Sequence, residues 1–306
     1  MEIGTEFWVG FIAFLMAAIG FDLGLHRKKD EALSVKDSMV RVKIWVALAV
    51  IFGAWVWHYI GAEKGLEFFT GYIIELSLSM DNVFIIAIIF SYFSVPIQYQ
   101  HRVLFWGIVG ALMMRGAMIW AGSSLITEFG WVLYIFGAFL ILTGIKLAFT
   151  RNEHYDPSKN PVVRVARRLI PITDQFHGKK FWVKQNGRWM ATPLFVVLLL
   201  IEATDLVFAV DSVPAIFAVT LDPFVVFTAN AFAILGLRSM YFLLAGMITK
   251  FYYLKLGLAV LLIFVGVKMS IVEWYHIPTT TSLAAILAIL GVAVMASILR
   301  AKKLKQ

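Results

Sequence analysis

The chain has no cysteine in its 306 residues, which excludes disulfide bonds, thiolate metal sites and cysteine nucleophiles together. Charged residues are also scarce, at 15% of the chain against roughly a quarter in an ordinary soluble domain. The first residues lack the basic stretch that opens a cleaved signal peptide, so we expect the first apolar run to be retained. Hydrophobic residues make up 61% of the sequence instead. This composition predicts a protein of the lipid bilayer.

Nine apolar runs are long enough to predict helices that cross a membrane. They cover residues 7–25, 44–60, 68–93, 103–122, 130–149, 193–219, 224–244, 254–272 and 282–299. We therefore predict an all-α, polytopic transmembrane helical bundle with about nine spans.

The basic residues are concentrated on alternate connections. Connections 26–43, 94–102, 151–192 and 245–255, with the tail 300–306, hold 22 of the 27 Lys and Arg residues. The N-terminal end and the other connections hold one, Lys64. Basic loops stay in the cytoplasm, so we expect a multi-pass protein of a bacterial inner membrane, with its N-terminus outside and its C-terminus in the cytoplasm. The same rule explains the net charge of +8, and no nucleic-acid partner is expected.

A three-helix unit recurs in the sequence. Asp81 is followed by Arg115 after 34 residues and by Lys146 after a further 31, and Asp205 is followed by Arg238 after 33 residues and by Lys268 after a further 30. Three anchors at nearly constant spacing indicate an internal repeat. Because three is an odd number of helices, the two copies must cross the membrane in opposite directions. Inverted repeats that share a site near the bilayer midplane are a recurring transporter architecture.

The repeat divides the chain into five segments. Residues 1–65 hold the first two helices, 66–150 the first three-helix repeat, 151–192 a basic cytoplasmic loop, 193–272 the second, inverted repeat, and 273–306 the ninth helix with a basic cytoplasmic tail. The loop interleaves basic and aromatic residues, as nucleic-acid-binding proteins do. A cytoplasmic loop with one interfacial amphipathic helix over 162–170 explains this pattern better.

Six acids lie within the predicted spans or at their ends: Asp22, Glu75, Asp81, Glu202, Asp205 and Asp211. A carboxylate at the bilayer centre costs about 2.5–3.5 kcal/mol even on insertion scales, so such residues face a protein interior, a partner or an aqueous cavity. We expect Arg115 and Arg238 to act as charge partners of these acids, and purely structural ion pairing is the alternative to a functional site. Asp22 is a candidate gate or an interfacial partner of the basic residues that follow it.

The depth of each acid follows from its place along its span. Asp81 and Asp205 each lie about 12 residues from one end of a span, which puts both near the midplane. Because the two spans run in opposite directions, Glu75 and Asp211 are expected together, about 9 Å to the outer side of that pair. Glu202 is expected about 4.5 Å to its cytoplasmic side.

Glu202 and Asp211 are nine residues apart, which is about half a revolution away from a shared face on a straight helix. Either this span is broken near Pro214, or the two acids serve different states of a transport cycle. Pro214 also frees the carbonyl oxygen of Val210, which is a further oxygen available to a cation.

The surroundings of these acids are rich in oxygen. Asn82 supplies an amide and nearby Ser and Thr residues supply hydroxyls, while all six histidines lie at span ends or in loops. Oxygen ligands are typical of Mg²⁺, Ca²⁺ and Mn²⁺ sites. We therefore predict a divalent-cation site formed by Glu75, Asp81, Asn82, Glu202, Asp205 and Asp211. No tightly bound cofactor is expected.

The acidic motifs resemble those of the TerC family of integral membrane proteins: Glu75-Leu-Ser-Leu-Ser-Met-Asp81-Asn82, Glu202-Ala-Thr-Asp205, Asp211-Ser212-Val-Pro214 and the early Phe21-Asp22-Leu23-Gly24. Length and span number are most similar to its Alx-like branch. The resemblance implies export of Mn²⁺ from the cytoplasm and a relationship to LysE-type transporters with two three-helix halves. It also implies metal binding by the six residues of the predicted site. The family carries the older labels tellurium resistance and redox modulator.

We therefore expect a secondary transporter, not an enzyme, that exports divalent cations, above all Mn²⁺, by alternating access with a proton or sodium counter-ion. Two other classes stay open. One is a membrane-embedded metal-dependent enzyme, in which carboxylates would activate a water molecule. The other is a membrane scaffold or redox modulator associated with tellurite resistance, although the chain lacks cysteine and any haem or flavin signature. Metal-dependent flux through the purified protein alone separates the transporter from both.

Overall fold

The computed structural model describes residues 4–26, 35–149, 161–185, 187–244, 253–275 and 277–303. These ranges contain α1 (Thr5–His26), α2 (Val35–Tyr59), α3 (Ala62–Tyr92), α4 (Ile97–Glu128), α5 (Val132–Phe149), α6 (Pro161–Leu169), β1 (Trp182–Gln185), β2 (Arg188–Ala191), α7 (Pro193–Phe217), α8 (Pro223–Leu244), α9 (Leu254–Ser270) and α10 (Thr279–Lys303). The nearly all-helical architecture confirms the fold class expected from the apolar runs, and a helix coincides with each of the nine predicted ranges.

Seven of the described helices are long and apolar enough to cross a bilayer: α2, α3, α4, α5, α7, α8 and α10. The apolar part of α1, Thr5–Phe21, is shorter, and α9 has 17 residues. A membrane-embedded helical protein is therefore established, while a total of nine spans stays a prediction.

Prolines mark the starts of several helices. Pro193 and Pro223 occupy the first positions of α7 and α8, where the missing N–H is not needed. The carboxylate of Asp222 caps α8 by accepting from the backbone N–H groups of Phe224 at 3.0 Å and Val225 at 3.4 Å. Pro214 lies in the last turn of α7, and the helix continues through it to Phe217. The break considered near Pro214 is therefore wrong.

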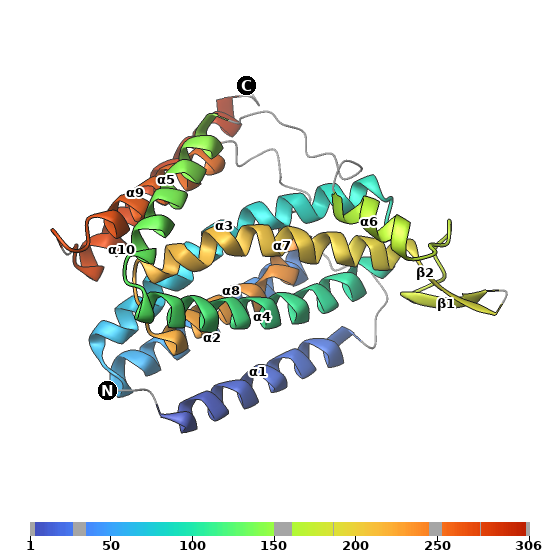
Figure 1. The fold of residues 1–306 in the computed structure, drawn as a ribbon, viewed down its shortest axis with the longest axis horizontal. Helices are drawn as coiled ribbons and strands as arrows, with labels where there is room; N and C mark the ends of the chain where they lie inside the picture. The colour runs from blue at the N-terminus through green and yellow to red at the C-terminus, as the bar shows by residue number, and fades with distance from the viewer. Residues whose placement is uncertain are drawn as a thin grey trace.

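Four helices form the centre of the molecule (Figure 1). α3 packs against both α7 and α8, and α4 packs against the same two helices from the other side. α2 covers α3 and α8, and α1 lies against α8 at the edge of the bundle. α5, α9 and α10 pack together as a separate group that crosses the end of the central helices at a steep angle. The central four helices therefore enclose the space in which buried polar side chains meet.

α5 and α9 cross closely because both carry glycine at the contact. A side chain at Gly144 would collide with the backbone of α9 at Ala259, and one at Gly137 would collide with Ser270. Gly266 of α9 has the same relationship to the backbone of α5. The pairing of late α5 with early α9 shows that the two helices run antiparallel.

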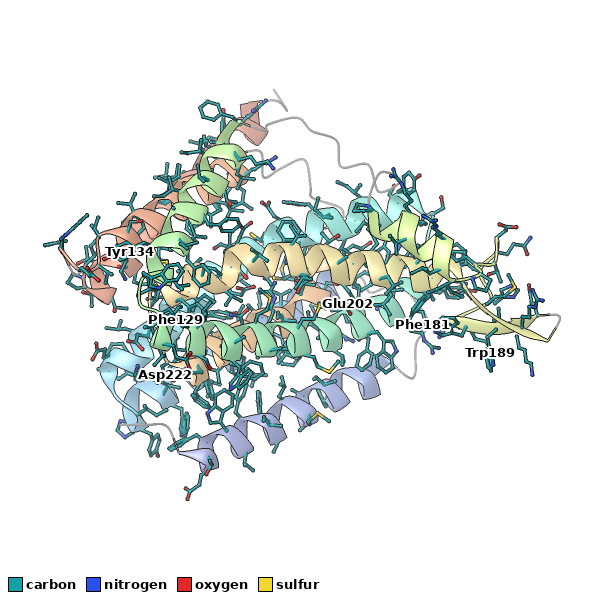
Figure 2. All side chains as sticks on the ribbon, viewed as in Figure 1. Phe129, Tyr134, Phe181, Trp189, Glu202 and Asp222 are labelled. Carbon is teal, nitrogen blue, oxygen red and sulfur yellow. The ribbon has the colours of Figure 1, made fainter. Side chains whose placement is uncertain are left out.

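The basic loop contains more structure than the sequence predicted. The amphipathic helix expected over 162–170 is present as α6, and it packs against α7. The strands β1 and β2 then form an antiparallel hairpin that pairs Trp182 with Ala191, with Gly187 in the left-handed region at the turn (φ 78°). Figure 2 shows Trp189 of this hairpin and Phe181 at one end of the molecule, and Phe129 and Asp222 at the other.

Candidate functional site

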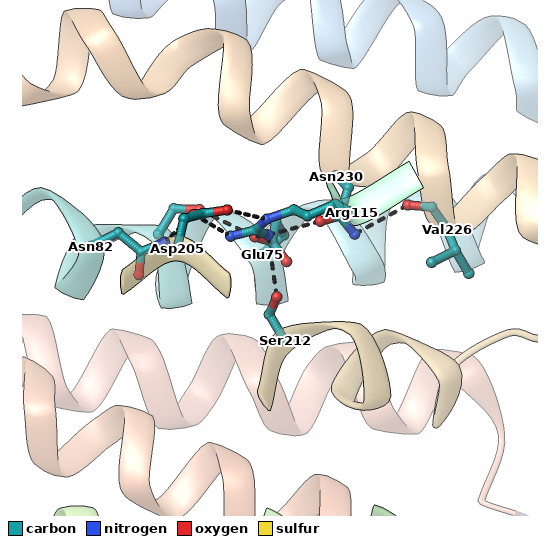
Figure 3. A network of polar contacts seen from close by, with 8 residues as sticks. Glu75, Asn82, Arg115, Asp205, Ser212, Val226 and Asn230 are labelled. Atoms are coloured by element: carbon teal, nitrogen blue, oxygen red, sulfur yellow. Dashed lines mark hydrogen bonds and ion pairs between the residues drawn. The ribbon is translucent and has the colours of Figure 1, made fainter. Parts of the chain in front are cut away.

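Arg115 lies at the centre of a polar network inside the bundle (Figure 3). Its guanidinium group donates to both carboxylate oxygens of Asp205, at 2.9 Å to Oδ1 and 3.2 Å to Oδ2. It also forms an ion pair with Oε1 of Glu75. The side chains of Arg115 and Glu75 are 1% and 0% exposed, and that of Asp205 is 14% exposed. A buried guanidinium from α4 is thus neutralised by acids from two other helices, α3 and α7.

Neutral polar groups complete the network. The amide of Asn82 on α3 donates to Oδ1 of Asp205 at 3.2 Å. On the other side of the guanidinium, Nη1 of Arg115 donates to Oδ1 of Asn230 on α8 at 2.9 Å and to the hydroxyl of Ser212 on α7 at 3.2 Å. All four central helices therefore contribute a polar side chain to one connected group.

α3 and α7 run in opposite directions through the network. Asn82, late in α3, contacts Asp205, whereas Glu75, two turns earlier in α3, is linked through Arg115 to Ser212, two turns later in α7. Residues seven apart lie on one face of a helix, so each helix presents one polar face to the other. The opposed directions agree with those expected from the loop charges, and the inverted repeat itself remains a prediction.

Asn82, rather than its neighbour Asp81, makes the contact to Asp205. Successive residues of a helix point about 100° apart, so Asp81 faces a different side of α3. There it is half-buried and is attracted electrostatically by Lys255 of α9. The structure therefore brings the predicted ligands Glu75, Asn82 and Asp205 around one centre and directs Asp81 toward another helix.

Glu202 and Asp211 point to opposite sides of α7. The carboxylate of Glu202 lies against Gly110 of α4, in space that a Cβ atom at that position would fill. Asp211 faces α5, where Thr143 and Lys146 favour its charged form. Figure 2 shows Glu202 midway along the bundle. Because α7 is continuous, the two acids lie about half a revolution apart, as the sequence predicts. Glu202 faces α4, and Asp211 faces α5.

Several of these oxygens are buried and have no hydrogen-bond partner. Within the described residues, unpartnered atoms include Oε2 of Glu75, Oδ1 of Asn82, Oε2 of Glu202 and Oδ1 of Asp211. A buried acceptor without a partner costs about 1–3 kcal/mol, and more when it is charged. Four of the six predicted ligands thus hold an oxygen that a cation or a proton donor would satisfy.

A cavity of about 20 Å³, room for one water molecule or small ion, adjoins the network between the four central helices. Its polar wall consists of Asn82, Thr204 and Asp205. Its apolar wall includes Ile86 and Ile201, which belong to the same hydrophobic cluster as Val163 of α6. The cavity therefore lies on the side of the network that faces α6 and the hairpin.

Glu75 and Asp205 meet the guanidinium of Arg115, whereas Asp81 faces Lys255 and Asp211 faces Lys146. Within residues 4–26, 35–149, 161–185, 187–244, 253–275 and 277–303, no three His, Asp or Glu side chains come close enough to hold a metal ion on their own. In this arrangement the guanidinium of Arg115 takes the position between Glu75 and Asp205 that a cation would need.

The remaining predicted residues lie elsewhere. Arg238 is 3% exposed, and its Nη2 donates to Nδ1 of His101, near the start of α4, at 3.2 Å. The backbone of Asp22 belongs to α1, but its side chain lies outside the described part of the chain. Its role as a gate therefore stays a prediction.

Sequence reasoning missed two residues of the site. Asn230 is a lone amide in the apolar run of α8, and the argument applied to buried acids would have identified it had it been extended to amides. Gly110 carries no such signal, because its importance comes from the carboxylate of Glu202 that packs against it. Only the packing of α4 against α7 reveals it.

Comparison with known proteins gives close relatives along almost the whole chain. A Myxococcus xanthus protein named uncharacterized membrane protein STKORF319 is 50% identical over 295 residues, which cover 96% of this chain and 92% of that protein. An Escherichia coli K12 protein named "Putative membrane-bound redox modulator Alx" is 47% identical over 298 residues, covering 94% of this chain and 93% of that protein. No solved structure matches the chain. The model of the integral membrane protein TerC family matches residues 60–305, and the chain therefore belongs to the TerC family.

Proposed function

We propose that this protein is a secondary transporter that moves divalent cations, above all Mn²⁺, out of the cytoplasm through a site between α3 and α7. The observation that carries the proposal is the set of buried carboxylate and amide oxygens at the centre of the bundle. Glu75 and Asn82 each hold one oxygen without a hydrogen-bond partner, on the face of α3 that meets Asp205. Buried acids that are not fully paired by protein groups indicate a path for an ion.

The chemistry of the ligands selects the kind of cation. Glu75, Asn82 and Asp205 supply only oxygen atoms, and the chain has no thiolate to offer. Such ligands suit Mg²⁺, Ca²⁺ and Mn²⁺ better than the softer ions that prefer sulfur or imidazole. Mn²⁺ is chosen among these because the motifs resemble a family for which export of Mn²⁺ is implied.

The packing of the central helices supports an inverted-repeat transporter. The first helix of each proposed repeat packs against the second helix of the other, α3 on α8 and α7 on α4. The third helices, α5 and α9, cross antiparallel at glycine. Two halves related in this way have equivalent surfaces on both sides of the membrane, which is what alternating access requires.

The two ends of the site differ: one adjoins a cavity, and the other is bridged by ion pairs. On the side of α6 and the hairpin, the cavity beside Asp205 and Asn82 has room for one water molecule or small ion. At the opposite end, Nζ of Lys64 bridges Glu67 at 2.9 Å and Asp222 at 3.4 Å, and so ties α3 to the residue before α8. With the N-terminus expected outside, we propose that the metal ion enters the site from the side of α6 and the hairpin, and that a proton or sodium ion is exchanged for it.

Flux measured with the purified protein in liposomes tests the proposal. Liposomes that contain the protein should accumulate radioactive Mn²⁺ when an outward-directed proton or sodium gradient is imposed. The rate of accumulation should fall at least about tenfold in Asp205→Asn, because one of the two negative charges that hold the ion is lost. Glu63→Gln, an exposed acid at the start of α3, is the matched control and should transport normally. Equal flux in empty liposomes, or in Asp205→Asn, contradicts the proposal.

A further inference from the structure

Arg115 is a cation that the protein itself places at the centre of its acidic site. We propose that Arg115 competes with the transported ion: its guanidinium occupies Glu75 and Asp205 when no metal is bound, and the metal displaces it. This inference rests on the proposed transport of divalent cations and assigns to Arg115 the choice between divalent and monovalent ions.

The guanidinium occupies the position between the two carboxylates that a bound metal ion would take. It bridges one carboxylate of α3 and one of α7, the two helices whose opposed polar faces form the site. It is 1% exposed, so water does not screen these contacts. Next to the bridge, Oε2 of Glu75 and Oδ1 of Asn82 lack hydrogen-bond partners. An ion between the same two carboxylates would gain these oxygens, which the planar fork of Arg115 does not reach.

The displaced guanidinium has a place to remain. Nη1 of Arg115 already donates to Oδ1 of Asn230 at 2.9 Å and to the hydroxyl of Ser212 at 3.2 Å. The amide nitrogen of Asn230 donates to the carbonyl oxygen of Val226 at 3.3 Å, which fixes the amide with its oxygen toward Arg115. Both neutral acceptors would stay with the arginine after the two carboxylates turned to a metal ion.

Charge decides which ions can displace it. Glu75 and Asp205 carry two negative charges, and Arg115 neutralises one of them. A divalent ion neutralises both, so it gains electrostatically from the exchange. A monovalent ion carries no more charge than the guanidinium that it would replace, and it lacks the five donors of Arg115. The tethered arginine therefore keeps Na⁺ and K⁺ from the Glu75–Asp205 pair and admits divalent ions to it.

Equilibrium binding to the purified protein in detergent tests the inference without reference to flux. Isothermal titration with Mn²⁺ should show at least about tenfold tighter binding to Arg115→Gln than to the wild type, because charge-assisted hydrogen bonds no longer oppose the ion. Arg115→Lys keeps the charge but not the fork, and its affinity should fall between the two. Addition of 100 mM NaCl in place of choline chloride should weaken Mn²⁺ binding by Arg115→Gln and leave the wild type unchanged. Arg102→Gln, an exposed arginine on α4 that stacks on Phe181, is the control.

The outcomes separate the two proposals. Tighter binding in Arg115→Gln, or in Arg115→Lys if the glutamine variant does not fold, supports the inference. If the wild type binds Mn²⁺ and neither variant binds it more tightly, the inference is overturned and the proposed transport stands. If neither the wild type nor any of the three variants binds Mn²⁺, both are overturned.

Discussion

Loss of the Glu75 charge should destabilise the protein, because it leaves a buried arginine only partly neutralised. Breaking a buried ion pair by removing one partner costs about 3–5 kcal/mol. The side chains of Glu75 and Arg115 are 0% and 1% exposed, so the cost for a buried ion pair applies to them. Asp205 keeps its two hydrogen bonds to Arg115 at 2.9 and 3.2 Å, which places the cost of Glu75→Gln near the lower limit, at about 3 kcal/mol. For a chain of 306 residues, that corresponds to a fall in melting temperature of about 5 °C.

Thermal unfolding in detergent, followed by the loss of monodisperse protein after heating, measures this effect. The experiment is done in the presence of EDTA, so that metal binding does not contribute. Glu63→Gln removes the same charge from an exposed position of the same helix and should melt within about 1 °C of the wild type. If Glu75→Gln also melts at the wild-type temperature, the ion pair does not hold α3 to α4, and the reasoning from burial is refuted.

Two further variants test single contacts. Gly110→Ala should slow Mn²⁺ flux at least about threefold with folding intact, because the added Cβ displaces the carboxylate of Glu202. Gly291→Ala, where a Cβ meets open space, is the control. Equal flux in the two variants would contradict this role of Glu202. Asp222→Ala should destabilise the protein by about 1 kcal/mol through loss of the cap of α8, whereas Asp222→Asn keeps the cap and loses only the pair with Lys64. Equal losses of melting temperature in the two variants would show that the ion pair, not the cap, matters at this position.

The helices could be predicted from the sequence because lipid imposes a simple rule on it. Each apolar run coincides with a helix, since a backbone in hydrocarbon must satisfy its own hydrogen bonds. The opposed directions of α3 and α7 could also be predicted, both from which connections are basic and from the odd number of helices in each repeat. The hairpin β1–β2 was missed, since two strands of four residues in a polar loop leave no long pattern.

The residues of the site were predicted less well than the helices that carry them. Asp81 and Asn82 are adjacent, and which of them meets Asp205 depends on the rotation of α3, which neighbouring helices set by packing. The repeat spacing made Arg115 and Arg238 equivalent, yet Arg115 contacts two acids and Arg238 contacts His101. Spacing along a chain does not specify what a long side chain reaches across a bundle.

The position of bound Mn²⁺ tests the central claim most directly. Crystals of the protein grown with MnCl₂ and measured above and below the manganese absorption edge would locate the ion by its anomalous signal. The account predicts one strong peak between α3 and α7, in coordination distance of Glu75 and Asp205, with the guanidinium of Arg115 moved toward Asn230. Manganese found only at the surface, with Arg115 still bridging Glu75 and Asp205, would contradict it.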